Sequence, residues 1–189
     1  MSKLFFRYSS MGAGKTLELL KVAYNYEEKN KVVLLLTSSF DDRNGIGKIT
    51  SRTGLSRDAM IISSEDNIFE LVKEQSNISC VLVDESQFLT KKHIFQLTDI
   101  VDELDIPVIC YGLRSDFKLN PFEGSSYLMA IADDIEEIKT ICWCGKKANI
   151  NARISDGKIM KRGEQIQIGG NETYTALCRK HYKEGKINE

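Results

Sequence analysis

Continuous apolar runs alternate with amphipathic stretches along the first two thirds of the chain. The clearest runs are Val32-Val33-Leu34-Leu35-Leu36 and Cys80-Val81-Leu82-Val83. Strands that helices cover on both faces have this pattern, because neither side of the strand meets water. Strands are therefore predicted over residues 4–8, 32–37, 60–62, 80–84 and 107–111.

Helical periodicity fills the segments between these strands, over residues 16–29, 64–75 and 91–104. The second helix would begin at the cap residue Ser64. The third carries an apolar stripe that we assign to the core, and His93 near its start is expected at the surface. The alternation predicts an α/β fold in which a parallel sheet is flanked by helices.

The composition changes near residue 140, where Gly, Asn, Lys and Arg become frequent and cysteines cluster. A segment of this size is too small to be held together by an apolar core alone. We therefore expect an α/β domain over residues 1–139 and a small C-terminal subdomain over residues 140–189.

Charge limits the classes of partner. The 189 residues carry a formal net charge of −1, so no global basic field is present to hold a nucleic acid. The start of the chain does not resemble a signal peptide, and no apolar run is long enough to span a membrane, which favours the cytoplasm. The basic side chains of the C-terminal subdomain are assigned to a solvated loop: Lys146, Lys147, Arg153, Lys158, Lys161 and Arg162.

The first predicted strand leads into Ser9-Ser10-Met11-Gly12-Ala13-Gly14-Lys15-Thr16, and a helix follows. In a P-loop with this context, backbone N–H groups hold phosphates, the lysine reaches the β- and γ-phosphates, and the hydroxyl binds Mg²⁺. Ser9 replaces the usual first glycine, whereas Gly14-Lys15-Thr16 is intact. The alternative is a helix cap that contains glycine.

Two carboxylates, Asp84 and Glu85, end the fourth predicted strand. Asp84 is expected to hold Mg²⁺ with Thr16, because ligands bind at the carboxyl edge of such a sheet. Glu85 would point the other way if the strand pleat continues, so it could act as a general base beside the metal. The alternative is a strand-end turn with solvated acids.

Four soft ligands lie in two pairs, Cys142 with Cys144 and Cys178 with His181. Two ligands at each end of a loop suit a tetrahedral structural zinc ion. The first pair has the C-x-C spacing, which is tighter than the common C-x₂-C. Gly145, directly after this pair, would let the backbone make the turn that this spacing requires. The loop between the pairs, residues 145–177, is called the lasso here. The alternative is a set of buried thiols beside a surface histidine; Cys80 and Cys110, inside predicted strands, are assigned to the core.

Together these motifs resemble the thymidine kinase family of the small, zinc-containing cellular type, in a bacterial-type branch, over nearly the whole chain. The resemblance implies a RecA-like P-loop sheet with a zinc-stapled lasso subdomain. Arg114 stands where many members carry Asp. The further matching segments are Asp41-Asp42-Arg43, Ser51-Arg52-Thr53-Gly54, Val83-Asp84-Glu85-Ser86-Gln87-Phe88, Gly112-Leu113-Arg114-Ser115-Asp116-Phe117 and residues 168–174.

The resemblance implies transfer of the γ-phosphoryl group of ATP to the 5′-hydroxyl of thymidine. Glu85 would take the proton, with Lys15 and Arg43 as further catalytic residues and Asp41 near the metal. The nucleotide site would comprise Ser9, Ser10, Met11, Gly12, Ala13, Gly14, Lys15, Thr16, Asp84, Glu85, Ser86 and Gln87. The thymidine site would comprise Met11, Leu113, Phe117, Gln165, Ile166, Gln167, Ile168, Gly169 and Tyr174.

Family membership would further imply a homotetramer and feedback inhibition by thymidine triphosphate. Deoxyuridine would be a poorer substrate, because a pocket discriminates one methyl group by only about 1–3 kcal/mol. Two other functions stay open on sequence alone. One is a P-loop ATPase of DNA repair or recombination, and the other is a zinc-ribbon nucleic-acid-binding module.

Overall fold

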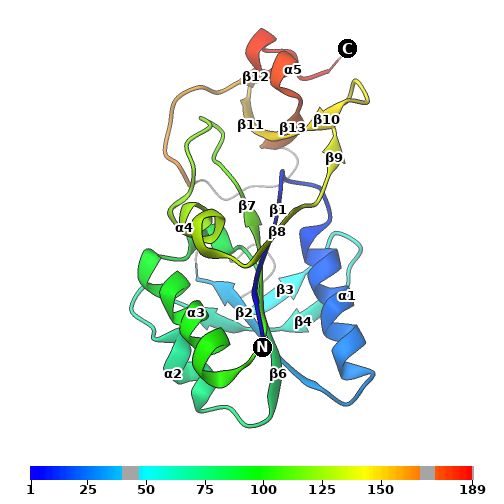
Figure 1. The fold of residues 1–189 in the computed structure, drawn as a ribbon. Helices are drawn as coiled ribbons and strands as arrows, with labels where there is room; N and C mark the ends of the chain where they lie inside the picture. The colour runs from blue at the N-terminus through cyan, green and yellow to red at the C-terminus, as the bar shows by residue number, and fades with distance from the viewer. Residues whose placement is uncertain (40–46, 167–172, 189) are drawn as a thin grey trace.

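A computed structural model describes residues 1–39, 47–166 and 173–188, and its centre is a sheet of six parallel strands (Figure 1). The strand order is β5-β2-β6-β7-β1-β8. The strand that precedes Asp84 is thus separated from the P-loop strand by β7, as in the RecA-like fold that was predicted. The strands are β1 (Leu4–Ser9), β2 (Val32–Ser38), β5 (Met60–Ile62), β6 (Ile78–Val83), β7 (Val108–Leu113) and β8 (Asp134–Glu137).

Helices cover both faces of the sheet, as Figure 1 shows. One face carries α1 (Lys15–Glu27), and the other carries α2 (Ile68–Lys73), α3 (Lys91–Leu104) and α4 (Glu123–Ile131). Alternate residues of β2 enter the two cores: Leu35 packs in the cluster on the α1 face and Leu36 in the cluster on the opposite face. This two-sided burial explains why the strands are continuous apolar runs.

Two small elements complete the α/β part of the chain. β3 (Lys48–Thr50) and β4 (Ser56–Asp58) form an antiparallel hairpin beside α1 (Figure 1). A 3₁₀ helix, η1 (Ser86–Phe88), follows the end of β6.

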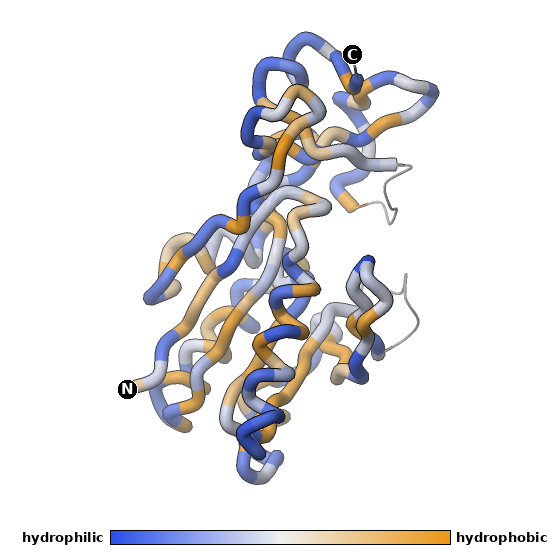
Figure 2. The backbone as a smooth tube through the Cα atoms, turned by 90° about the vertical axis from the view of Figure 1, so that its right-hand side faces the viewer, coloured by the Kyte–Doolittle hydropathy of each residue, from blue (hydrophilic) through white to orange (hydrophobic). Residues whose placement is uncertain are grey.

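The C-terminal segment lies beyond the carboxyl ends of the parallel strands (Figure 1). Its own core is small and separate, and includes Ile150, Leu177 and Tyr182. Figure 2 shows the contrast in hydropathy: apolar residues follow the sheet, whereas this segment is mostly hydrophilic. Its elements are β9 (Thr140–Ile141), β10 (Lys147–Ala148), β11 (Ile150–Ser155), β12 (Lys158–Ile159), β13 (Tyr174–Leu177) and α5 (Arg179–Glu184).

The five predicted strands and three predicted helices are all present, but two details of the prediction were wrong. α2 begins at Ile68, because Asn67 caps it and Asp66 instead accepts hydrogen bonds from the N–H and hydroxyl of Ser63. His93 is buried at 2% exposure, since its ring turns back to cap α3 at Thr90. Among the described residues, no helix has the length and apolar character needed to cross a membrane.

Candidate active site and metal site

The P-loop lies between β1 and α1, where the sequence placed it. Gly12 and Gly14 adopt φ angles of +76° and +88°, which favour glycine. Ser9 is the last residue of β1 and needs no such freedom. Its hydroxyl accepts a hydrogen bond from Nζ of Lys15 at 3.0 Å, and the carbonyl of Ser10 accepts another at 3.3 Å. Lys15 is 8% exposed, so its ammonium group is held within the P-loop and not in open solvent.

Asp84 comes directly after β6 and faces the start of α1. The hydroxyl of Thr16 donates to its Oδ2 at 3.2 Å, which places the two predicted Mg²⁺ ligands side by side. Burial raises the pKa of the Asp84 carboxyl, the nearby charge of Glu85 raises it further, and Lys15 opposes both effects. Thr16 and Asp84 therefore offer a hydroxyl and a carboxylate side by side. These are oxygen ligands of the kind that a hard divalent cation prefers, and such a cation would stabilise the buried carboxylate.

β6 ends at Val83, so Glu85 does not continue the strand. The prediction that its side chain points away from that of Asp84 assumed a continued strand and was wrong in that respect. The φ of +51° at Glu85 turns the chain into η1. Its carboxylate accepts a hydrogen bond from Nε2 of Gln87 at 2.5 Å, and Oε1 of Gln87 accepts one from the N–H of Leu113 at 3.0 Å. Gln87 is 2% exposed, so this link between the acid and β7 is shielded from water.

Two glycines let neighbouring elements pack against the loop of Glu85. A Cβ on Gly124, in α4, would lie only 2.4 Å from the carbonyl oxygen of Ser86. A Cβ on Gly112, in β7, would lie 2.7 Å from the hydroxyl of Ser86. A side chain at either position would have to displace the loop, so both glycines help to fix the place of Glu85.

The predicted thymidine residues gather where the C-terminal segment meets the carboxyl ends of the strands. Phe117 is buried, and the guanidinium carbon of Arg153 lies 3.7 Å from the centroid of its ring. Nε of Arg153 donates to the hydroxyl of Tyr174 at 2.9 Å. Nε2 of Gln165 donates to Asp116 at 3.2 Å, which joins the lasso to the segment after β7. Ile166 is partly exposed at 38%.

Arg153 was wrongly assigned to a solvated loop: it is 4% exposed. Besides Tyr174, it donates to the carbonyl oxygens of Glu164 and Gln165 at 2.8 and 3.3 Å. It thus fixes the described part of the lasso next to Phe117. Apolar and polar residues alternate over Ile150–Ser155, and this pattern puts Arg153 on the polar face of a strand, so the sequence did not mark it as buried.

Asn151 is a second residue that the sequence argument missed. It is 4% exposed, its Oδ1 accepts from the N–H of Met11 at 2.7 Å, and its Nδ2 donates to the carbonyl of Ser115 at 3.3 Å. It connects the P-loop, the C-terminal segment and the segment after β7. Arg114, the departure from the family pattern, lies with its guanidinium 5.7 Å from the ring centroid of Tyr8.

Several predicted site residues lie outside the described part of the chain: Asp41, Asp42, Arg43, Gln167, Ile168, Gly169, Gly170, Asn171 and Glu172. The site geometry therefore rests on the remaining residues.

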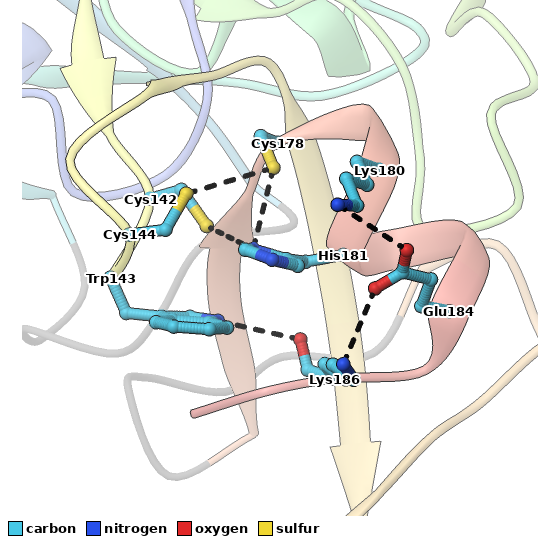
Figure 3. A network of polar contacts seen from close by, with 8 residues as sticks. All are labelled: Cys142, Trp143, Cys144, Cys178, Lys180, His181, Glu184 and Lys186. Atoms are coloured by element: carbon cyan, nitrogen blue, oxygen red, sulfur yellow. Dashed lines mark hydrogen bonds and ion pairs between the residues drawn. The ribbon is translucent and has the colours of Figure 1, made fainter. Parts of the chain in front are cut away.

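The predicted metal ligands converge in the C-terminal segment, as Figure 3 shows. The ligand atoms of Cys142, Cys144, Cys178 and His181 all lie within 4.8 Å of one another. Sγ of Cys144 and Sγ of Cys178 are 4.0 Å apart, and Nδ1 of His181 lies 3.5 Å from the sulfurs of Cys142 and Cys178. Tetrahedral zinc with ordinary bond lengths separates two sulfurs by about 3.8 Å and a sulfur from a nitrogen by about 3.6 Å. The donor set and its spacing therefore fit zinc.

Local backbone geometry brings these ligands together. Gly145 adopts a φ of +79° in the β9–β10 turn, as its position after the C-x-C pair suggested. α5 begins directly after Cys178, so Cys178 and His181 lie on the same side of its first turn. Burial opposes the Cys142 thiolate, but backbone groups of Cys144 and Cys178 outweigh it and lower the pKa of Cys142 to about 6. The thiolate is the form that binds metal.

The chain closely resembles known proteins along its length. The family model described as thymidine kinase matches residues 2–182. A thymidine kinase of Haemophilus influenzae is 54% identical over 188 residues, covering 97% of each chain. Thymidine kinases of Lactiplantibacillus plantarum and Listeria monocytogenes are 55% and 58% identical; they cover 96% and 95% of this chain and 96% of their own length.

Proposed function

This chain belongs to the thymidine kinase family, and from that premise we propose that it transfers the γ-phosphoryl group of ATP to the 5′-hydroxyl of thymidine. The observation that carries the proposal is the arrangement at the carboxyl edge of the sheet. There the P-loop lysine, the Thr16–Asp84 pair and Glu85 lie together. Such a site supplies phosphate binding, a cation position and a base for an acceptor hydroxyl.

In the proposed reaction each residue acts by position and charge. The P-loop amides and Lys15 hold the phosphates. Thr16 and Asp84 would hold Mg²⁺, which would supply positive charge to offset the charge of the phosphates. Glu85 accepts the proton of the 5′-hydroxyl as its oxygen attacks the γ-phosphorus. ADP and thymidine monophosphate leave. Catalysis in such kinases is mostly positioning and charge stabilisation, which suits a base held by Gln87.

A coupled assay tests the reaction. Purified protein with MgATP should release ADP only when thymidine is present, and thymidine monophosphate should form in equal amount. Deoxyuridine should be phosphorylated less efficiently, with kcat/KM lower by about 10- to 200-fold, because one methyl group separates the two nucleosides. Release of ADP without nucleoside would favour the ATPase alternative and overturn the proposal.

The lasso is proposed to bind the pyrimidine, with Phe117 and Tyr174 against the nucleoside and Met11 and Leu113 at the methyl group. Support comes from Arg153, which ties the lasso carbonyls of residues 164 and 165 to Phe117 and Tyr174. Backbone groups held in this way can read the edge of a base with little ordering cost on binding.

Replacing Arg153 with methionine should raise the KM for thymidine by about 10- to 100-fold, because charge-assisted hydrogen bonds to the lasso are lost. The KM for ATP should change little, since Arg153 contacts no P-loop residue among its described partners. Steady-state kinetics with each substrate varied in turn measures both constants. Arg162→Met, at an exposed arginine of the same subdomain, is the control. Equal rises in both KM values would contradict the assignment.

Other features remain proposals. Zinc is assigned a structural role, because four protein ligands leave no position open for substrate. The homotetramer, feedback inhibition by thymidine triphosphate, the cytoplasmic location and the domain boundary at residue 140 rest on the family resemblance or on sequence. The DNA-repair ATPase and the nucleic-acid-binding module are not favoured, because the match to thymidine kinases covers nearly the full chain.

A further inference from the structure

The β3–β4 hairpin brings a guanidinium group to the phosphate loop. The turn between the two strands carries Arg52. A Cβ atom built on Gly12 would lie 3.3 Å from Nη1 of Arg52 and 3.9 Å from its Cζ. Gly12 is in the middle of the P-loop, two residues before the Gly14 cap of α1. The guanidinium therefore lies beside the backbone amides that cradle phosphate.

The hairpin is fixed along α1, so the place of Arg52 is set by the backbone. Ile49 is 2% exposed and packs in the core cluster of Leu19 and Leu20. The pair of Arg57 with Glu27, 3.6 Å long and exposed, contributes little to this packing, because water and salt screen exposed charges. Backbone hydrogen bonds close the turn, from the N–H of Ser51 to Leu55 and from the N–H of Gly54 to Ser51.

The charge of Arg52 has no protein partner in the described part of the chain. Arg52 is exposed, and among residues 1–39, 47–166 and 173–188 it makes no hydrogen bond or ion pair. Lys15 belongs to the same P-loop and carries a second positive charge, with its Nζ donating to Ser9 and Ser10. An exposed guanidinium beside the P-loop amides favours an anion there, and its fork of N–H donors matches the oxygens of a phosphate.

We propose that Arg52 is a catalytic residue that stabilises the transferring γ-phosphoryl group, acting as an arginine finger in cis. The inference rests on the phosphoryl transfer proposed above. In that step the bond from O5′ to the γ-phosphorus forms and the bond to the β,γ-bridging oxygen breaks. The proton of the 5′-hydroxyl passes to Glu85, and the electron pair of the broken bond leaves with ADP. Arg52 donates hydrogen bonds to the oxygens on which this charge develops.

Arg52→Gln tests the inference, and Arg57→Gln on the same hairpin is the matched control. For Arg52→Gln, kcat should fall by about 10³-fold, the lower end of the range for arginine fingers. The Kd of a non-hydrolysable ATP analogue should stay within about threefold, because the contact forms mainly in the transition state. The melting temperature should match the wild type, since Arg52 is exposed. Arg57→Gln should leave kcat and this Kd unchanged.

Chemical rescue separates charge stabilisation from a structural effect. Added guanidinium ion should restore part of the turnover of Arg52→Ala, and urea at the same concentration should not. A kcat for Arg52→Gln within about threefold of wild type would overturn the inference and leave the thymidine kinase assignment intact. A loss confined to ATP affinity would assign Arg52 to ground-state binding and would also overturn it. An inactive wild type would overturn the proposed function and this inference together.

Discussion

Replacing Glu85 with glutamine should lower kcat by about 10²- to 10⁴-fold, the usual contribution of a general base. Glutamine keeps the size of the side chain and can still bond to Gln87, but it cannot accept the proton of the 5′-hydroxyl. The Kd for MgATP should change little, because the P-loop, Thr16 and Asp84 are untouched. Single-turnover measurements of thymidine monophosphate formation, with a separate binding titration for ATP, give the two quantities.

Two further variants make this prediction specific. Glu103→Gln removes an exposed carboxylate on α3, far from the P-loop in sequence, and should leave kcat unchanged. Gln87→Leu removes the 2.5 Å hydrogen bond to Glu85 and the contact to Leu113, so it should lower kcat while the base itself remains. Undiminished turnover in Glu85→Gln would remove Glu85 from the role of base.

The sequence predicted well wherever the signal is local. β2 and β6 are continuous apolar runs because both of their faces are buried, and Gly14-Lys15-Thr16 sits at a strand–helix turn because a phosphate loop needs that turn. The cluster of candidate metal ligands was also visible in the sequence, since each of its two pairs lies within four residues along the chain.

The sequence failed where the outcome depends on contacts between distant segments. Arg153 is buried because Phe117, Tyr174 and the lasso carbonyls surround it, and none of these is its sequence neighbour. Asn151 is buried because it bridges Met11 and Ser115, which are 140 and 36 residues away. Glu85 turns out of the strand because Gln87 and the close approach of α4 at Gly124 hold the loop.

Replacing Cys178 with serine should remove the bound zinc and disorder the C-terminal segment. Structural zinc contributes about 10–16 kcal/mol of apparent binding free energy in small peptides, which is folding free energy for a segment with a core as small as this one. Metal analysis should find about one zinc per chain in the wild type and none in the variant. Thymidine phosphorylation should be lost, because the lasso is tied at this site. ATP binding at the P-loop should persist, because α1 and the sheet have their own cores.

Trp143 provides a direct readout of the metal site. It is the only tryptophan of the chain, and its ring stacks on His181 with centroids 4.2 Å apart (Figure 3). Its fluorescence should therefore change when a chelator strips the metal and return when zinc is added. Cys80→Ala is the matched control: Cys80 is buried in the α1-face core, so that variant should keep its zinc and its fluorescence response. A metal-free protein that is fully active would show that zinc is not needed to hold the lasso at the thymidine site. A Cys178→Ser variant that keeps both zinc and turnover would show that Cys178 is not a required ligand.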